Sequence, residues 1–542
     1  MSLVFSSRSN TLEQTEYSYE LQDVEEPRLY RHLYPYDEPP RVPFNHRHVP
    51  MRPPEEIWIT DTTFRDGQQA RAPYTVKQIV DLYKFLHQLG GPKGKIRQTE
   101  FFLYSQKDRE AVEKCMELGY KYPEITSWIR ARKEDFKLVK EMGLKETGIL
   151  ASCSDYHIFR KLGMTRRQAM EQYLSIVEAA LEVGIIPRVH LEDITRADFY
   201  GFVVPFAHQL MRLSQESGLP IKIRACDTMG FGVSYPGAAL PRSVPGIIYG
   251  LWHHARVPNE WLEWHGHNDF YKVVTNAATA WLYGSSAVSC TLLGIGERTG
   301  NCPLEAMVFE YIGLRGTADG MDTTVITDIA RYYEKEIGYR IPPMTPLVGS
   351  AFNLTRSGIH ADGLLKDEEI YTIFNTEKIL KLRPRVSINP HSGLAGLAHW
   401  VNSYFNIPQE ERIDKRDSRL VKLKEWVDAQ YAAERQTVIG EDELVDMARL
   451  GRRVARLIRV VIFLRVGIRD RLRIEVLEGG LQVQHRGRDF HRQLGRRRTA
   501  GTHRGVDGGA SRGLAVQIPV LVRGRGLGQA RSGVRPCVRS GR

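Results

Sequence analysis

The chain has 542 residues, which is too long for one ordinary domain. Its hydrophobic content of 42% is ample for a large core. It contains no apolar run of about 18 residues, and the N-terminal stretch MSLVFSSRSNTLEQTEYSYE has no apolar signal core, so we expect a cytoplasmic protein with no membrane partner. Six cysteines without a C-x-x-C pair predict reduced thiols and no disulfide framework.

The net charge of +12 is confined to the end of the chain. Residues 451–542 contain 22 Arg, no Lys and 5 acidic residues, a net charge of +17, whereas the rest has 54 basic and 59 acidic residues, a net charge of −5. This Arg/Gly-rich tail also lacks Asn, Tyr, Met and Trp, as expected when GC-rich DNA is translated in a wrong frame. We hypothesise a frameshifted or disordered tail. The alternative is a nucleic-acid-binding tail, and no nucleic acid partner is expected from residues 1–450.

Residues 1–56 are rich in Tyr, Pro, Glu and His and show little periodicity, which predicts an irregular N-terminal extension. From Ile57, short β-branched or apolar runs alternate with longer amphipathic segments, the pattern of βα units around a parallel sheet. The predicted strands are 57–63, 97–104, 123–129, 145–152, 186–193, 221–228, 261–268 and 287–296. Eight such units predict an α/β fold, a (β/α)8 TIM barrel over 57–315, with a doubly wound open sheet as the alternative.

Polar residues follow six of these predicted strands, where a TIM barrel carries its active site. The most distinctive cluster is WLEWHGHND at 261–269, in which His265 and His267 are one residue apart. Alternate side chains of a strand share a face, so both imidazoles can bind one metal ion. An isolated H-x-H can also be an ordinary strand end; the five other clusters favour a metal site.

The motifs DTTFRDGQQ, SDYH, HLEDITRAD, DTMG, HGHND and GIGERTGN, in this order, resemble the 2-isopropylmalate synthase and homocitrate synthase family. These metal-dependent acyl-CoA Claisen enzymes have a TIM barrel and belong to the HMG-CoA-lyase-like superfamily. The resemblance covers roughly 57–450. It implies an acyltransferase that condenses acetyl-CoA, as co-substrate, with a 2-oxo acid, in amino-acid biosynthesis such as that of leucine. The alternative is a C–C lyase or a carboxyltransferase on the same barrel.

The resemblance implies a specific set of site residues. The metal ligands would be Asp66, His265, His267 and Asn301. One carboxylate, two imidazoles and an amide oxygen suit Zn, Mn or Mg and leave room for a bidentate 2-oxo acid. The metal would polarise the ketone, and Arg65 would stabilise the developing alkoxide.

The remaining expected site residues lie on several segments. His360, in SGIHADG, would be the catalytic acid/base, assisted by Tyr371 and Glu192. His157, Thr228 and Glu297 would line the substrate pocket or support the metal, with Glu297 orienting Arg65 or a ligand. His360 would belong to a smaller, mostly helical subdomain at 316–450, which in this family packs against a partner barrel in a homodimer.

Two departures from the family pattern concern the substrate. Gln68 stands where many members have Glu or Asn, and Phe270-Tyr271-Lys272 replaces a Gly-containing stretch after HND. The lyase branch has a Cys in a glycine-rich loop after the eighth strand, whereas GERTGNCPLE here follows the synthase form. The sequence therefore favours a synthase and leaves the 2-oxo acid open.

Overall fold

The computed structural model describes residues 3–6, 11–14, 19–372, 374–437, 439–448, 473–477 and 480–484. The chain forms two compact units, 1–414 and 415–542. The hypothesis of a frameshifted or disordered tail lies outside the described residues, apart from β13 (Arg473–Leu477) and β14 (Gly480–Gln484), which pair as antiparallel strands.

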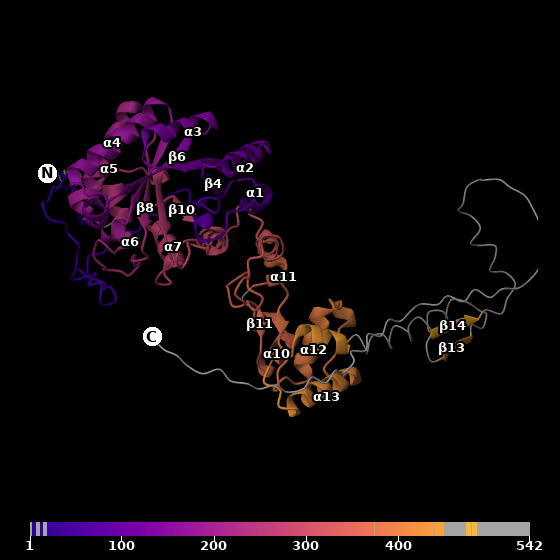
Figure 1. Ribbon diagram of the computed structural model, residues 1–542. Helices are drawn as coiled ribbons and strands as arrows, with labels where there is room; N and C mark the ends of the chain where they lie inside the picture. Colours follow the sequence, from indigo (N-terminus) through magenta and orange to yellow (C-terminus); the bar gives the residue numbers. More distant parts are fainter. Residues whose placement is uncertain are drawn as a thin grey trace, which may run out of the picture. The chain divides into compact units, whose positions relative to one another are not determined.

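Eight parallel strands close into a barrel in the order β10-β3-β4-β5-β6-β7-β8-β9, with helices around them (Figure 1). The strands are β3 (Trp58–Asp61), β4 (Ile96–Phe101), β5 (Glu124–Ile129), β6 (Glu146–Ser152), β7 (Ile186–Glu192), β8 (Lys222–Asp227), β9 (Leu262–Gly266) and β10 (Ala287–Cys290). All eight predicted strands and the TIM barrel are confirmed. The open-sheet alternative is excluded because β10 pairs with β3.

The barrel helices are α1 (Val76–Gly90), α2 (Gln106–Met116), α3 (Phe136–Glu141), α4 (Arg166–Glu182), α5 (Val204–Ser217), α6 (Val244–Tyr249), α7 (Val273–Tyr283) and α8 (Leu304–Arg315). Local sequence sets several of their starts. Thr75, Ser105 and Thr165 each begin a helix with a reciprocal capping box. Such caps satisfy backbone N–H groups that the first helical turn leaves without partners.

The barrel core extends beyond residue 315. In α9 (Val325–Tyr332), Ile326 and Ile329 belong to the same hydrophobic core as the barrel helices. The hydroxyl of Tyr333 lies 2.8 Å from that of Tyr74, before α1. The predicted boundary at 315/316 therefore separates residues that share one core.

The strand predicted at 287–296 is shorter than expected. It ends at Cys290, and the turn at Leu292–Gly294 follows, with Leu293 in a left-handed conformation at φ 58°. The Leu293 N–H donates to the buried carboxyl of Glu305 at 3.1 Å. This turn begins the loop that carries Asn301.

Much of the N-terminal extension packs on the barrel loops. Tyr34 is buried, and its hydroxyl donates to the carbonyl of Thr195, after β7, at 2.5 Å. Arg28 pairs with Asp198 at 2.5 Å, and its backbone N–H donates to Asp155 at 2.7 Å. These contacts tie residues 28–34 to the loops after β6 and β7.

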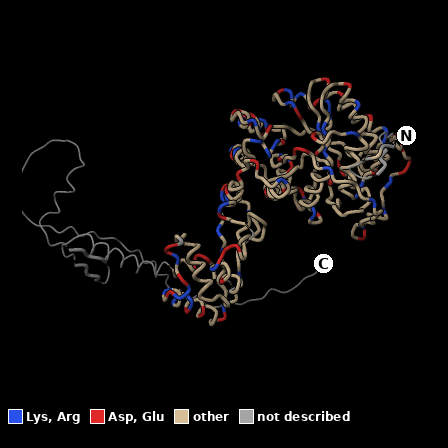
Figure 2. The backbone as a smooth tube through the Cα atoms, turned by 180° about the vertical axis from the view of Figure 1, so that it is seen from behind, with Lys and Arg blue, Asp and Glu red and all other residues tan. Residues whose placement is uncertain are grey.

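After the barrel come α10 (Gly358–Lys366), α11 (Thr376–Leu380), α12 (Leu394–Tyr404) and a two-strand pair, β11 (Leu354–Thr355) with β12 (Arg385–Val386). The second unit includes α13 (Ser418–Ala432). None of the helices in the described parts of the chain combines the length and the apolar character of a membrane span. Basic and acidic residues are interspersed along the described chain (Figure 2).

Glu305 gives the fold a pH dependence. Burial raises the pKa of its carboxyl from 4.5 to about 7. The folded protein therefore holds this proton more tightly than the unfolded chain does. Its contribution to stability is largest below pH 4.5, falls as pH rises to about 7, and differs by about 3 kcal/mol between these limits.

We predict that Glu305→Gln, whose amide is neutral throughout, becomes progressively more stable than the parent protein between pH 5 and pH 8. Thermal unfolding midpoints of both proteins at several pH values measure this. A difference between them that does not change with pH would contradict the assignment.

Candidate metal centre and active site

The strongest cluster of metal-ligating side chains lies at the carboxyl ends of β3 and β9. Asp66 follows β3, His265 is in β9, and His267 comes directly after that strand. One potential ligand atom of each lies within 4.8 Å of the others, and all three side chains are buried. His265 Nε2 is 3.3 Å from Asp66 Oδ2 and 3.3 Å from His267 Nε2.

Asn301 joins this cluster from the loop after β10. Its Nδ2 donates to Asp66 Oδ2 at 2.5 Å, and a backbone bridge links it to His267. The structure therefore brings together all four residues predicted as ligands, from three separate segments of the barrel: the loop after β3, the end of β9 and the loop after β10.

Burial and charge set the protonation of the cluster. Burial lowers the pKa of His265 far below its ordinary range although Asp66 opposes this, and burial likewise lowers the pKa of His267. Burial alone would raise the pKa of Asp66, but Arg65, together with the hydrogen bond from Asn301, holds it below its usual value. The site thus presents a carboxylate and two neutral imidazoles, the forms that bind metals.

Two buried atoms support a fit to a metal ion. Asn301 Oδ1 and His267 Nδ1 are buried and have no hydrogen-bond partner among the described residues. His265 is oriented by Ser289, whose hydroxyl lies 3.0 Å from Nδ1, so Nε2 faces Asp66. Buried polar atoms without a hydrogen-bond partner call for an explanation, and a bound ion beside the Asp66 carboxylate is one. The residues fit a divalent ion such as Zn, Mn or Mg.

Two glycines of GIGERTGN make room for Asn301. A Cβ at Gly296 would lie 1.7 Å from Asn301 Oδ1, so any side chain there requires the Asn301 amide to move. Gly300 has φ 96°, and a Cβ there would lie 2.2 Å from the carbonyl oxygen of Gly294. The glycine spacing therefore shapes the loop around the amide.

Arg65 lies between the cluster and a buried glutamate. Its Nη1 is 3.0 Å from Asp66 Oδ1, and its Nε donates to Glu100 Oε2 at 2.7 Å. The sequence assigned the orientation of Arg65, or of a ligand, to Glu297. In the structure Glu297 is 60% exposed and pairs with Arg298 at 3.7 Å. Glu100 on β4 orients Arg65 instead, because it lies inside the barrel.

A second polar group contains two of the three predicted substrate-pocket residues, His157 and Thr228, together with Glu192, which was predicted to assist catalysis. His157 Nδ1 is 3.0 Å from Glu192 Oε2, and Lys161 Nζ is 3.2 Å from the same oxygen. Burial would raise the pKa of Glu192, but His157, Ser152 and Lys161 lower it to about 2, so it is ionised. Thr228 accepts a hydrogen bond from the backbone N–H of Asp193 at 2.9 Å.

His360 and Tyr371 contact each other in the subdomain after the barrel. His360 is in α10, and the two ring centroids are 4.3 Å apart. Both side chains are exposed, Tyr371 by 45%. Their approach to the metal cluster stays a prediction from the family resemblance.

The charged interior of the barrel was not predicted from the sequence. The missed residues are Glu100, Glu146, Arg188, His190, Arg224 and Glu263. A signal was present: charged residues stand at alternate positions of the predicted strands, as in Arg188 and His190, or Glu263 and His265. Alternate strand positions share a barrel face, so this spacing indicates inward-facing charges.

Comparisons with known proteins show the family of this chain. The HMGL-like family model matches residues 56–332. The chain is 59% identical to a citrate (Re)-synthase of Clostridium kluyveri (79% of this chain, 94% of the relative) and 60% identical to one of Syntrophus aciditrophicus (79% and 68%). It is 30% identical to a 2-isopropylmalate synthase of Caldanaerobacter subterraneus (66% and 87%).

The chain belongs to the HMGL-like family, as its motifs predicted. These relatives are synthases, and the chain is an enzyme of that class. The finer prediction of a 2-isopropylmalate or homocitrate synthase has less support, because identity is about twice as high to the citrate (Re)-synthases.

We predict that Gly296→Ala weakens binding of Mn²⁺ by about 10- to 100-fold, because the added methyl displaces the Asn301 amide. Isothermal titration of the metal-free protein measures the affinity. The matched control is Gly313→Ala in α8, where a Cβ meets no atom within 4 Å. Equal affinities for the two variants would show that Asn301 is no part of the metal site.

Proposed function

We propose that this enzyme is a citrate synthase of the Re type, which condenses acetyl-CoA with oxaloacetate. The observation that carries the proposal is the identity of 59% and 60% to two citrate (Re)-synthases, together with the metal cluster of Asp66, His265 and His267. Citrate contains the two-carbon acetyl unit joined to the ketone carbon of oxaloacetate. Forming that bond requires a carbanion equivalent from acetyl-CoA and an activated ketone.

The cluster of Asp66, His265, His267 and Asn301 would activate the ketone. Asp66, His265, His267 and Asn301 would hold a divalent metal, which when bound supplies Lewis-acid polarisation of the ketone. Arg65 is 8% exposed and adjoins Asp66, so its N–H groups can stabilise the oxygen on which negative charge develops. Burial strengthens this electrostatic stabilisation because little water screens it.

The second requirement is a base that removes a proton from the acetyl methyl group. We assign this role to His360, with Tyr371 and Glu192 assisting, since an imidazole exchanges protons near neutral pH. The contact of His360 with Tyr371 supports a paired role. His157 and Thr228 would orient the 2-oxo acid from the loops after β6 and β8. Hydrolysis of the citryl thioester then releases CoA.

The proposal also includes the oligomeric state and the location of the enzyme. A cytoplasmic homodimer, in which the subdomain after the barrel serves a partner's active site, agrees with the exposure of His360. The competing assignment is a synthase acting on 2-oxoisovalerate or 2-oxoglutarate.

A panel of 2-oxo acids tests the substrate. With acetyl-CoA and Mn²⁺, we expect CoA release with oxaloacetate to exceed that with 2-oxoisovalerate, 2-oxoglutarate or pyruvate by at least about 10-fold in kcat/KM. A chelator should abolish the reaction, and added metal should restore it. Preference for another acid would reject the citrate assignment, and activity in excess chelator would reject the metal role.

His360 is tested by His360→Ala, which we expect to lower kcat by about 100- to 10,000-fold. The matched control is His391→Ala, another exposed histidine of the same subdomain, for which we expect parental activity. If both variants keep parental kcat, the base lies elsewhere.

A further inference from the structure

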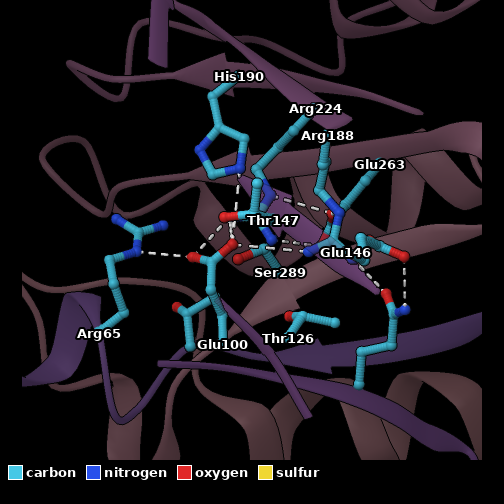
Figure 3. A network of polar contacts seen from close by, with 12 residues as sticks. Arg65, Glu100, Thr126, Glu146, Thr147, Arg188, His190, Arg224, Glu263 and Ser289 are labelled. Carbon is cyan, nitrogen blue, oxygen red and sulfur yellow. Dashed lines mark hydrogen bonds and ion pairs between the residues drawn. The ribbon is translucent and has the colours of Figure 1, made fainter. Parts of the chain in front are cut away.

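An alternating row of charges runs through the barrel interior and ends at the metal cluster. Its members, in order of contact, are Lys222, Glu146, Arg188, Glu263, Arg224, Glu100, Arg65 and Asp66. Figure 3 shows its central part, with Glu100 between Arg65 on one side and Arg188 and Arg224 on the other. The proposed function uses only the last two members, which leaves the purpose of the others open.

Within this row, Arg224 contacts both Glu263 and Glu100. Arg224 Nε is 3.0 Å from Glu263 Oε2, and its Nη2 is 3.3 Å from Oε1. The third nitrogen of the same guanidinium, Nη1, lies 3.0 Å from Glu100 Oε1 and 3.1 Å from Oε2. Arg224 therefore joins the two glutamates.

Glu100 is shared by competing cations. Its Oε2 accepts from Arg65 Nε at 2.7 Å, while Arg188 Nη1 stands 3.6 Å from Oε1. Burial would raise the pKa of Glu100, but Arg224, Arg65 and Arg188 hold it below its ordinary value. Each arginine thus affects where this carboxylate points.

Glu263 pairs with two of the arginines that also lie near Glu100. It engages Nε and Nη2 of Arg224 and also lies 3.3 Å from Arg188 Nε. Without its charge, both arginines would have Glu100 as a remaining nearby carboxylate. A buried charge that loses its partner is costly, so the side chains would rearrange to recover one. Glu100 would then turn toward Arg224 and away from Arg65.

We propose that Glu263 and Arg224 are positioning residues, which hold Glu100 in the orientation that aims Arg65 at the reacting oxygen. This inference rests on the role proposed for Arg65. It assigns catalytic importance to side chains that touch neither metal nor substrate. It also explains why the barrel is filled with charges at these positions: an apolar core could not fix the direction of a guanidinium.

The first test is Glu263→Gln, compared in the full chain with Asp198→Asn. Asp198 is also buried and pairs with a buried arginine, Arg166, at 3.0 Å, outside this row. We expect Glu263→Gln to lower kcat about 10- to 100-fold with little change in KM for oxaloacetate. Asp198→Asn should keep parental kcat. Equal kcat for Glu263→Gln and the parent, after correction for folded protein, would overturn the proposal.

A double-mutant cycle separates positioning from general damage. In an Arg65→Lys background, Glu263→Gln should cause no further loss of kcat, because the group that it positions has already been replaced. Losses that multiply would show that Glu263 acts independently of Arg65. Arg224→Lys keeps the charge but cannot hold both glutamates at once, so it should behave like Glu263→Gln.

A crystal structure of Glu263→Gln gives a readout independent of substrate. We expect the contact between Arg65 Nε and Glu100 Oε2 to be broken. If the parent enzyme does not act on oxaloacetate, the proposed substrate fails, but this structural result still stands. An Arg65–Glu100 contact unchanged from 2.7 Å would overturn the positioning role even in an active enzyme.

Discussion

The burial of charge inside the barrel is the constraint on which the site depends. Asp66, Arg65 and Glu100 form a continuous set of ion pairs with almost no exposure to water. Each buried charge is tolerated only because an opposite charge lies within contact distance. Such pairs add little net stability, but they fix the direction of each side chain, and the roles proposed for Arg65 and Asp66 require a fixed direction.

Much of the fold and part of the site follow from the sequence. Alternation of apolar runs and amphipathic helices identified all eight strands, because barrel strands are bounded by clear turns and caps. The candidate ligands Asp66, His265 and His267 could be predicted because polar residues at strand ends are conspicuous and because their motifs resemble those of a known family. The early end of the last strand was not predicted: β10 ends at Cys290, and Leu293 in the following turn has a left-handed backbone that the sequence alone does not show.

The charged interior was harder to predict for a physical reason. Glu100 and Glu263 are far apart in sequence, and each alone looks like an exposed strand residue. Only barrel closure brings both to Arg224. The prediction that Glu297 orients Arg65 or a ligand has the same origin, since Glu297 is close to the candidate ligand Asn301 in sequence but is exposed and pairs with Arg298. Contacts across a closed barrel depend on register, which motifs do not specify.

In the proposed function, Asp66, His265, His267 and Asn301 hold a metal ion that receives the 2-oxo acid. Anomalous diffraction from a crystal soaked with Mn²⁺ and oxaloacetate tests it most directly. The account predicts one strong peak within about 2.0–2.4 Å of these ligand atoms, with the 2-oxo acid in the same coordination sphere and Arg65 facing its ketone oxygen. Manganese bound elsewhere, or oxaloacetate bound away from this cluster, would contradict it.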